Sequence, residues 1–260
     1  MLLENKVAVI YGAAGAIGGA VARAFASEGA RVFVTGRNLA AVEALARDIG
    51  KSAEAAAVDA LDEQAIDRHL ESVVAKAGRI DISFNAIGFA PKKTLGTPLI
   101  KMDLEQFSLP LTGYLTSYFL TARLAARRMI ARKSGVIMTL SALPARSGTA
   151  LNGSYGPAQA AKEALTRDLS CELAREGIRV VTLRPHGIPE SNTMREVFEL
   201  KGKPAGMAWE QFTGHLAGTT HSRRVMRLDE VANMAAFIAS DKASGMTGTT
   251  VNLTMGALDD

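Results

Sequence analysis

Seven short apolar segments recur along the chain, and stretches with the spacing of amphipathic helices separate them. Short apolar runs that alternate with helical patterns are typical of a parallel sheet whose connections are helices. The pattern predicts an α/β fold with one doubly wound parallel sheet of about seven strands and helices on both faces. The predicted strands cover residues 7–10, 31–35, 54–58, 80–85, 135–140, 178–183 and 249–253.

A glycine-rich turn joins the first predicted strand to the helix pattern that follows it. Gly12, Gly15 and Gly18 have the spacing G-x-x-G-x-x-G, which lets the backbone close around a pyrophosphate at a helix N-terminus. A plain strand-to-helix turn is the alternative, but residues 7–37 continue through an amphipathic helix into a second strand. This order predicts a Rossmann-type sheet that binds a nucleotide cofactor.

The end of the second predicted strand bears on which cofactor is used. A carboxylate at this place would hold a ribose 2′-hydroxyl, whereas a 2′-phosphate needs a cation. The strand ends in Val34-Thr35-Gly36-Arg37, without an acidic residue. We therefore expect NADP(H) to be favoured over NAD(H), with Arg37 against the phosphate; a solvated loop arginine is the alternative.

Composition narrows the class of protein. Hydrophobic residues make up 48% of the 260 residues, and no linker or repeat divides them, so we expect residues 1–260 to form one dinucleotide-binding and catalytic domain. No apolar run approaches about 18 residues and no signal-peptide pattern begins the chain, which favours a cytoplasmic protein without membrane binding.

The net charge of +4 comes from scattered basic residues, which disfavours nucleic-acid binding. The single Cys171 excludes an internal disulfide and is predicted to be a buried thiol; no metal site is predicted.

Further motifs follow the later strands in a recognisable order. Asp59-Ala60 follows the third strand, Asn85-Ala86-Ile87-Gly88 the fourth, and Pro185-His186-Gly187-Ile188 the sixth, while Tyr155 follows Ser141 and opens a long helix pattern. Together with the glycine turn, these residues resemble the short-chain dehydrogenase/reductase family over almost the whole chain. The resemblance implies that Asp59 contacts the adenine amino group and that Tyr155 exchanges a proton with the substrate. It implies cofactor contacts by Gly12, Gly15, Ile17, Gly18, Arg37, Asp59, Ala60, Asn85, Ala86, Ile87, Gln159, Pro185, Gly187 and Ile188.

The resemblance also carries expectations about assembly and substrate access. Family members commonly associate through two long helices, here predicted over residues 105–133 and 155–176, so we expect a homo-oligomer, either a tetramer or a dimer. Residues 189–222 fall where the family caps its substrate, and they hold the only tryptophan. A small-molecule substrate under an apolar, mobile lid and an ordinary packed helical insertion are both compatible with this segment.

The catalytic positions depart from the family pattern. The family's Y-x-x-x-K becomes Tyr155-Gly156-Pro157-Ala158-Gln159, so glutamine replaces lysine. The family's serine position falls on Ala142, and only a bulge in the strand end would return Ser141 to the pocket. The family's asparagine falls on Tyr114, and the resemblance places His186 in the turn beside the nicotinamide; a loop histidine that is hydrogen-bonded to the backbone is the alternative. Tyr155, Ser141 and His186 are therefore the predicted catalytic residues.

These residues predict an NADP(H)-dependent oxidoreductase that reduces a carbonyl-like substrate. A phenol with a pKa of about 10 is a proton donor but a poor base at neutral pH, so we expect reduction to be faster than alcohol oxidation. Two alternatives stay open: a cofactor-binding protein with little redox activity, and a lyase or isomerase that moves protons with Tyr155, Tyr114 or His186. Lys162 shares the helix face of Tyr155 about 10 Å further along the axis, where a surface lysine and a partial substitute for the missing one are both compatible with the sequence.

Overall fold

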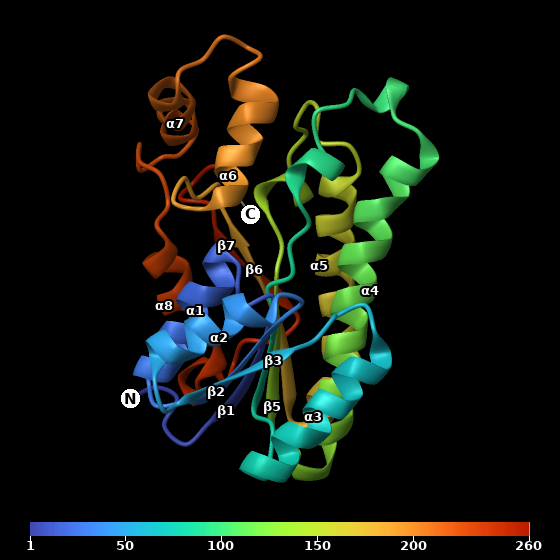
Figure 1. Cartoon of the computed structure of the whole chain (residues 1–260), viewed down its shortest axis with the longest axis vertical. Helices are drawn as coiled ribbons and strands as arrows, with labels where there is room; N and C mark the ends of the chain where they lie inside the picture. The colour runs from blue at the N-terminus through green and yellow to red at the C-terminus, as the bar shows by residue number, and fades with distance from the viewer. Residues whose placement is uncertain (260) are drawn as a thin grey trace.

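Seven strands form one parallel sheet in the order β3-β2-β1-β4-β5-β6-β7 in the computed structural model, which describes residues 1–259 (Figure 1). Every neighbouring pair of strands is parallel, which confirms the predicted fold class. The strand order reverses between β1 and β4, and ligands of such sheets bind at this switch point, beyond the carboxyl ends of the strands. The strands are β1 (Val7–Tyr11), β2 (Arg31–Gly36), β3 (Ala53–Ala57), β4 (Ile82–Asn85), β5 (Gly135–Leu140), β6 (Ile178–Pro185) and β7 (Thr249–Leu253).

Helices cover both faces of the sheet, as Figure 1 shows. One face carries α1 (Ala16–Ser27), α2 (Leu39–Ile49) and α8 (Leu228–Ala239), and the other carries α3 (Glu63–Ala77), α4 (Leu104–Met129) and α5 (Tyr155–Leu173). Two short helices, α6 (Asn192–Val197) and α7 (Trp209–Gly218), lie beyond the carboxyl ends of the strands. Cys171, predicted to be buried, is exposed on α5, because it lies on the side of that helix that faces away from the sheet.

Short polar side chains fix where several helices begin. Asn38 accepts a hydrogen bond from Ala41 N–H before α2, and Asp103 accepts one from Gln106 N–H before α4. Asp62 accepts hydrogen bonds from two backbone N–H groups at the start of α3. Such caps satisfy the backbone donors that a helix leaves free at its N-terminus and stabilise it by about 1 kcal/mol each.

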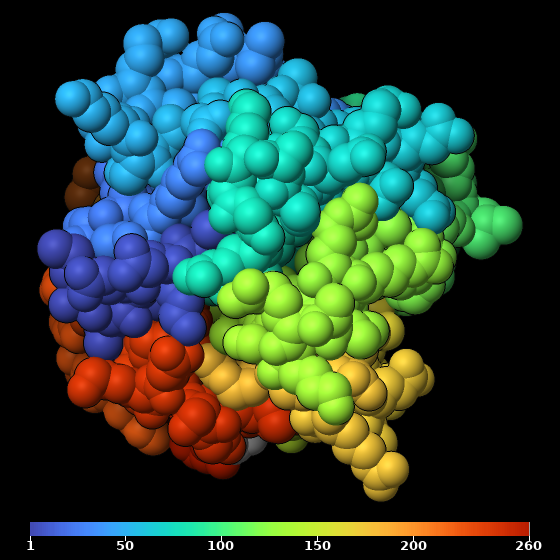
Figure 2. Space-filling model, turned by 90° about the horizontal axis from the view of Figure 1, so that it is seen from below, coloured from blue at the N-terminus to red at the C-terminus, as the bar shows by residue number. Residues whose placement is uncertain are grey.

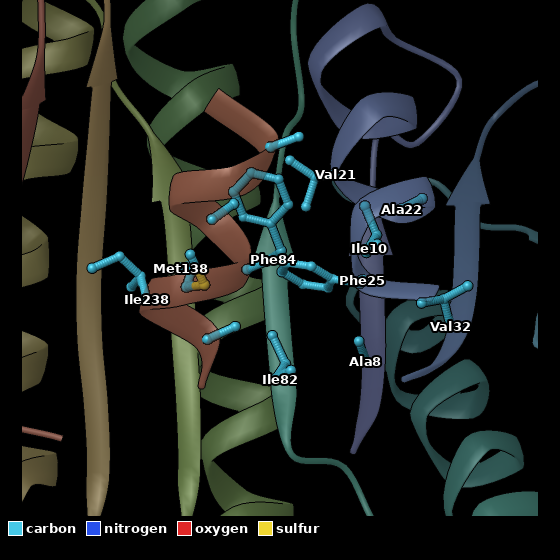
Figure 3. Close-up of a cluster of buried hydrophobic side chains, with 14 of the residues drawn as sticks. Ala8, Ile10, Val21, Ala22, Phe25, Val32, Ile82, Phe84, Met138 and Ile238 are labelled. Atoms are coloured by element: carbon cyan, nitrogen blue, oxygen red, sulfur yellow. The ribbon is translucent and has the colours of Figure 1, made fainter. Parts of the chain in front are cut away.

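The two faces of the sheet bury separate hydrophobic clusters. Successive side chains of β1 alternate between them: Ala8 and Ile10 join the cluster under α1 and α8, while Val9 joins the one under α3 and α4. Figure 3 shows the first cluster, in which Phe25 of α1 meets Phe84 of β4 with ring centroids 6.5 Å apart. Burial on both faces explains why the strands read as short, nearly continuous apolar runs.

Figure 2 shows the end of the molecule at the amino ends of the strands, where the N-terminal residues in dark blue lie near the turns that precede β4 and β5. A cavity of about 330 Å³ lies at this end and is lined by Lys6, Asp81, Arg179 and Asp241, among others. Lys6 pairs with Asp241 at 2.9 Å, Asp81 accepts from Val7 N–H, and Arg179 donates to backbone carbonyls. These charged groups have partners within the protein, so none of them is left to bind a ligand at this end. Within residues 1–259, no helix combines the length and hydropathy needed to cross a membrane.

Candidate functional site

The glycine turn between β1 and α1 has no room for side chains. Gly12 adopts a φ of +74°, and a Cβ at this position would lie 2.7 Å from the carbonyl oxygen of Ala86. A Cβ on Gly18 would lie 2.5 Å from the carbonyl oxygen of Gly12. Gly15 precedes α1, whose first turn receives no side-chain cap. The turn therefore fits an anionic group that approaches the backbone closely at a helix N-terminus.

The turn after β4 lies against the glycine turn and is held there by Asn85. The buried amide of Asn85 donates to Thr121 Oγ1 of α4 at 3.0 Å and accepts from Ile87 N–H at 3.2 Å. The backbone N–H of Ala86 donates to the carbonyl of Tyr11 at 2.9 Å. These bonds tie β1, β4 and α4 together at the switch point, so Asn85 positions the backbone of this predicted cofactor turn.

Arg37 and Asp59 lie at the carboxyl ends of β2 and β3, and both are exposed. Arg37 makes no ion pair with any of residues 1–259 and is therefore free to meet an added anion. Asp59 accepts from Leu61 N–H at 3.0 Å, which fixes the loop, and Ala60 beside it is buried. The strand ends thus place a free cation and a carboxylate where the adenosine half of a dinucleotide is expected.

Tyr155 is the first residue of α5. The helix start packs closely on the turn Leu143–Ala145, because a Cβ on Gly156 would lie 2.7 Å from the carbonyl oxygen of Pro144. The Tyr155 hydroxyl forms no hydrogen bond with the described residues. Burial, and to a smaller degree the neighbouring Tyr114 phenol, raise the pKa of Tyr155 above its ordinary value. At neutral pH, Tyr155 is therefore a proton donor rather than a base.

Tyr114 of α4 faces Tyr155. Their rings meet edge to face, with centroids 5.7 Å apart. Phe89 holds Tyr114 from the other side: its N–H donates to the Tyr114 hydroxyl at 3.2 Å, and the ring centroids are 4.8 Å apart. Gly113 makes this contact possible, since a Cβ at that position would collide with the Phe89 ring. Burial raises the pKa of Tyr114, so both phenols are neutral at pH 7.

Gln159 and Lys162 follow Tyr155 along the buried side of α5. Gln159 is 2% exposed and Lys162 1% exposed, and neither side chain forms a hydrogen bond or ion pair with the described part of the chain. The ammonium nitrogen of Lys162 lies 5.4 Å from the centroid of the Tyr114 ring. Burial lowers the pKa of Lys162 to about 7. The sequence left open whether Lys162 is a surface residue, and the structure buries it beside the tyrosine pair.

Ser141 is turned toward a buried ion pair. Its hydroxyl donates to Glu163 Oε1 at 2.6 Å, and Glu163 in turn binds Arg184 of β6 through both oxygens, at 2.8 and 2.7 Å. The bulge that would return Ser141 to the pocket is absent from the described strands, because β5 pairs with β6 in unbroken register as far as Leu140. Ser141 would have to break its bond to Glu163 to reach a substrate oxygen, so its catalytic role stays a prediction.

His186 follows β6 and is buried. Its Nε2 lies 3.2 Å from Thr219 Oγ1, just after α7, while Nδ1 has no partner among the described residues. Burial lowers the pKa of His186, which keeps the ring neutral at pH 7. Gly187 lies against Met194, since a Cβ there would be 3.2 Å from Met194 Cε, and Ile188 is buried. The turn after β6 is thus packed against the segment predicted to cap the substrate.

That segment, residues 189–222, contains α6, α7 and a π-helical turn (Phe198–Gly202) between them. Phe198, Trp209 and Phe212 form an aromatic cluster with ring centroids 5.4 to 5.8 Å apart. Lys201 attaches the segment to the loop before α5: its ammonium donates to the Ala150 carbonyl at 2.9 Å and to Asn152 Oδ1. The cap is therefore held by its own aromatic cluster and by polar attachments, which include Lys201 and the contact of Thr219 with His186. In residues 1–259, no group of side chains is arranged to hold a metal ion.

Comparisons with known proteins cover almost the full length of the chain. A family model described as "Enoyl-(Acyl carrier protein) reductase" matches residues 12–257. The 3-oxoacyl-(acyl-carrier-protein) reductase of Escherichia coli strain K12 is 28% identical over 256 residues, which are 98% of either chain. An oxidoreductase of Mycobacterium bovis is 32% identical over 257 residues, with the same coverage. The solved structure of 3-ketoacyl-(acyl-carrier-protein) reductase from Brucella melitensis complexed with NADH has a TM-score of 0.86 at 26% identity and covers 98% of this chain and 99% of its own.

Proposed function

The chain belongs to the short-chain dehydrogenase/reductase family of oxidoreductases, and from this premise we propose that it reduces a carbonyl-like substrate with NADPH and uses Tyr155 as the proton donor. The observation that carries the proposal is the placement of Tyr155. Its hydroxyl has no hydrogen-bond partner in residues 1–259, and Tyr155 opens α5, on which the amide of Gln159 is buried and without a partner among the described residues. A phenol whose pKa is raised holds its proton until an alkoxide forms beside it.

The residues at the strand ends fit a nicotinamide dinucleotide. The glycine turn accepts a pyrophosphate, and the buried Gln159 amide offers both a donor and an acceptor to a ribose. The nicotinamide, when bound, supplies the hydride. Arg37 supports the choice of NADP(H), because a free guanidinium at the end of β2 attracts a 2′-phosphate and no carboxylate lies there to repel it.

The direction of the reaction follows from the state of the phenol. Reduction needs a neutral Tyr155 that gives a proton to the product oxygen, whereas alcohol oxidation needs the phenolate as a base. Burial disfavours the phenolate, and Gln159 carries no charge that would stabilise it. We therefore expect reduction to be faster than oxidation at pH 7. The aromatic cluster of the cap favours a substrate with an apolar part.

The test combines binding and turnover. Calorimetry with NADPH, NADH and the oxidised forms measures cofactor affinity, and a panel of ketones and aldehydes is then followed at the nicotinamide absorbance. Tight NADPH binding with turnover that is lost in Tyr155→Phe supports the proposal. Turnover that survives in Tyr155→Phe contradicts Tyr155 as the donor.

One observation favours a second candidate, a cofactor-binding protein with little turnover. Two residues of the family's catalytic pattern are changed here: Gln159 stands in place of the lysine and carries no charge, and Ala142 stands in place of the serine, while the neighbouring Ser141 is bonded to Glu163. This candidate predicts tight cofactor binding, no turnover with any carbonyl, and a binding affinity that Tyr155→Phe leaves unchanged.

A further inference from the structure

Lys162 is a buried amine without a counter-ion. It is 1% exposed, and among residues 1–259 it forms no hydrogen bond and no ion pair. An isolated buried ammonium is unfavourable unless charge or hydrogen bonds compensate for the lost water. A lysine at the surface or an apolar residue at this position would avoid this cost in free energy. A buried lysine here therefore indicates that its charge has a function.

The side chain of Lys162 reaches back toward the catalytic end of α5. Side chains of an α-helix lean toward its N-terminus, which here is Tyr155. The ammonium accordingly lies 5.4 Å from the ring centroid of Tyr114, whose ring in turn lies 5.7 Å from that of Tyr155. Lys162 is seven residues after Tyr155 in the sequence, but the Tyr114 ring lies between the two side chains and brings the ammonium close to the tyrosine pair.

The other titratable groups near this part of α5 already have partners. Glu163 on α5 gives both carboxylate oxygens to Arg184 of β6, and Tyr118 of α4 is bonded to Thr166 at 2.9 Å. The turn Leu143–Ala145 and β7 contribute no ionisable side chain. The phenols of Tyr114 and Tyr155 remain, and only Tyr155 is placed to lose a proton in the proposed reaction.

We propose that Gln159 and Lys162 divide between them what a single lysine supplies in the family pattern: Gln159 hydrogen-bonds the cofactor ribose, and Lys162 supplies the positive charge that stabilises the phenolate of Tyr155. Lys162 is then a positioning residue, since its charge acts across the ring of Tyr114 and does not touch the substrate. This inference rests on the proposed reductase function.

The charge balance of the step shows when Lys162 acts. The carbonyl carbon receives a hydride, and the oxygen takes the proton of Tyr155, so that an O–H bond breaks on the tyrosine and another forms on the product. The phenolate left behind is stabilised by the Lys162 ammonium across the Tyr114 ring until a proton from water restores it. At an effective dielectric constant of about 20, two unit charges separated by roughly 6 to 11 Å change a rate by roughly 10- to 100-fold.

The experiment compares Lys162→Met, which keeps the volume and removes the charge, with the double variant Gln159→Lys/Lys162→Met, which returns a charge one turn closer to Tyr155. Lys242→Met, at an exposed lysine far along the chain, is the matched control. We expect Lys162→Met to lower kcat by about 10- to 100-fold with KM and the NADPH Kd within about 3-fold of wild type. The double variant is expected to recover most of kcat, and the control to match wild type.

Two further readouts separate a charge effect from a structural one. The wild-type kcat should fall as the pH rises past about 7, where Lys162 loses its proton, and this limb should be missing in Lys162→Met. Lysine ¹³Cε NMR of the protein without substrate should contain one resonance that titrates near pH 7 and disappears in Lys162→Met. An amine that titrates above pH 9, an unchanged kcat in Lys162→Met, or a double variant no faster than the single one would each overturn the inference.

The two proposals fail in different ways. If none of the carbonyls in the panel supports NADPH oxidation by the wild type, the proposed function fails, and this inference fails with it. If the wild type turns over and Lys162→Met keeps both its kcat and its pH limb, the inference alone is wrong.

Discussion

Replacing Lys162 with methionine should stabilise the protein at neutral pH. In an unfolded chain a lysine has a pKa of about 10.4, whereas burial lowers the pKa of Lys162 in the folded protein to about 7. Between these two values the unfolded state binds more protons than the folded state, so the free energy of unfolding rises as the pH rises from 7 toward 10. Below pH 7 both states are protonated and the full cost of the buried charge is present.

The size of the effect follows from the difference between the two pKa values. Roughly three pH units at about 1.4 kcal/mol each correspond to about 4 kcal/mol, an upper limit because the protein relaxes around the charge. Methionine preserves the apolar contacts of the lysine stem, so we expect Lys162→Met to gain about 2–4 kcal/mol at pH 6 to 7 and almost nothing at pH 10. A residue retained at such a cost to stability is typical of a functional site.

Urea denaturation at a series of pH values between 6 and 10 measures this gain. It should be done without cofactor and at one protein concentration, because ligand binding and association both shift apparent stability. The m-value should stay constant while the midpoint rises in Lys162→Met, and Lys242→Met should remain within about 0.5 kcal/mol of wild type at every pH. If Lys162→Met were less stable than wild type at pH 6, or if its stability had the same pH dependence as that of the wild type, the inference that Lys162 is a buried charge without compensation would be refuted.

Four further predictions concern the cofactor, the donor and the cap. Tyr155→Phe should lower kcat by at least about 100-fold while NADPH affinity, measured by calorimetry, changes little, since only the donated proton is removed. Arg37→Glu should reverse the cofactor preference and weaken NADPH binding by about 10- to 100-fold relative to NADH; equal losses for both cofactors would argue against a 2′-phosphate contact. Gly12→Ala should abolish cofactor binding, because the new Cβ would lie 2.7 Å from a backbone carbonyl oxygen at a φ of +74°; a circular dichroism spectrum like that of the wild type would show that the fold survives. Lys201→Met should speed amide exchange in residues 192–202, because it removes the polar attachment of this part of the cap to the loop before α5; unchanged protection would mean that the Lys201 bonds do not hold it.

The fold could be predicted from the sequence because its signals are local. Each strand is a short apolar run, and each crossover helix has its own apolar stripe, so neither needs knowledge of distant residues. The glycine turn could be placed for the same reason, because it lies between a predicted strand and a predicted helix. The Asn85 turn and Tyr155 were predicted from the family resemblance, and their roles stay predictions.

The remaining features of the site depend on residues far apart in the sequence. Ser141 meets Glu163 across 22 residues; the strand pattern indicates that Ser141 points away from the pocket without a bulge, but no local pattern identifies Glu163 as the acceptor of its hydrogen bond. Lys162 is buried because α4 packs beside it, with the Tyr114 ring 5.4 Å from its ammonium nitrogen. Helical periodicity places Lys162 on the same face as Tyr155 but does not say whether that face meets solvent or another helix.

The neighbouring Glu163 explains how a buried lysine can remain without a counter-ion. A carboxylate one residue away would ordinarily pair with the amine and cancel its charge. Here Arg184 of β6 binds both oxygens of Glu163, and Ser141 adds a third hydrogen bond, so the carboxylate is occupied by partners other than Lys162. Removing Arg184 would free Glu163 to approach Lys162, which would raise the pKa of the amine and neutralise its field at Tyr155. The ion pair and the free amine are therefore two parts of one arrangement, in which Arg184 keeps the charge of Lys162 available to the tyrosines.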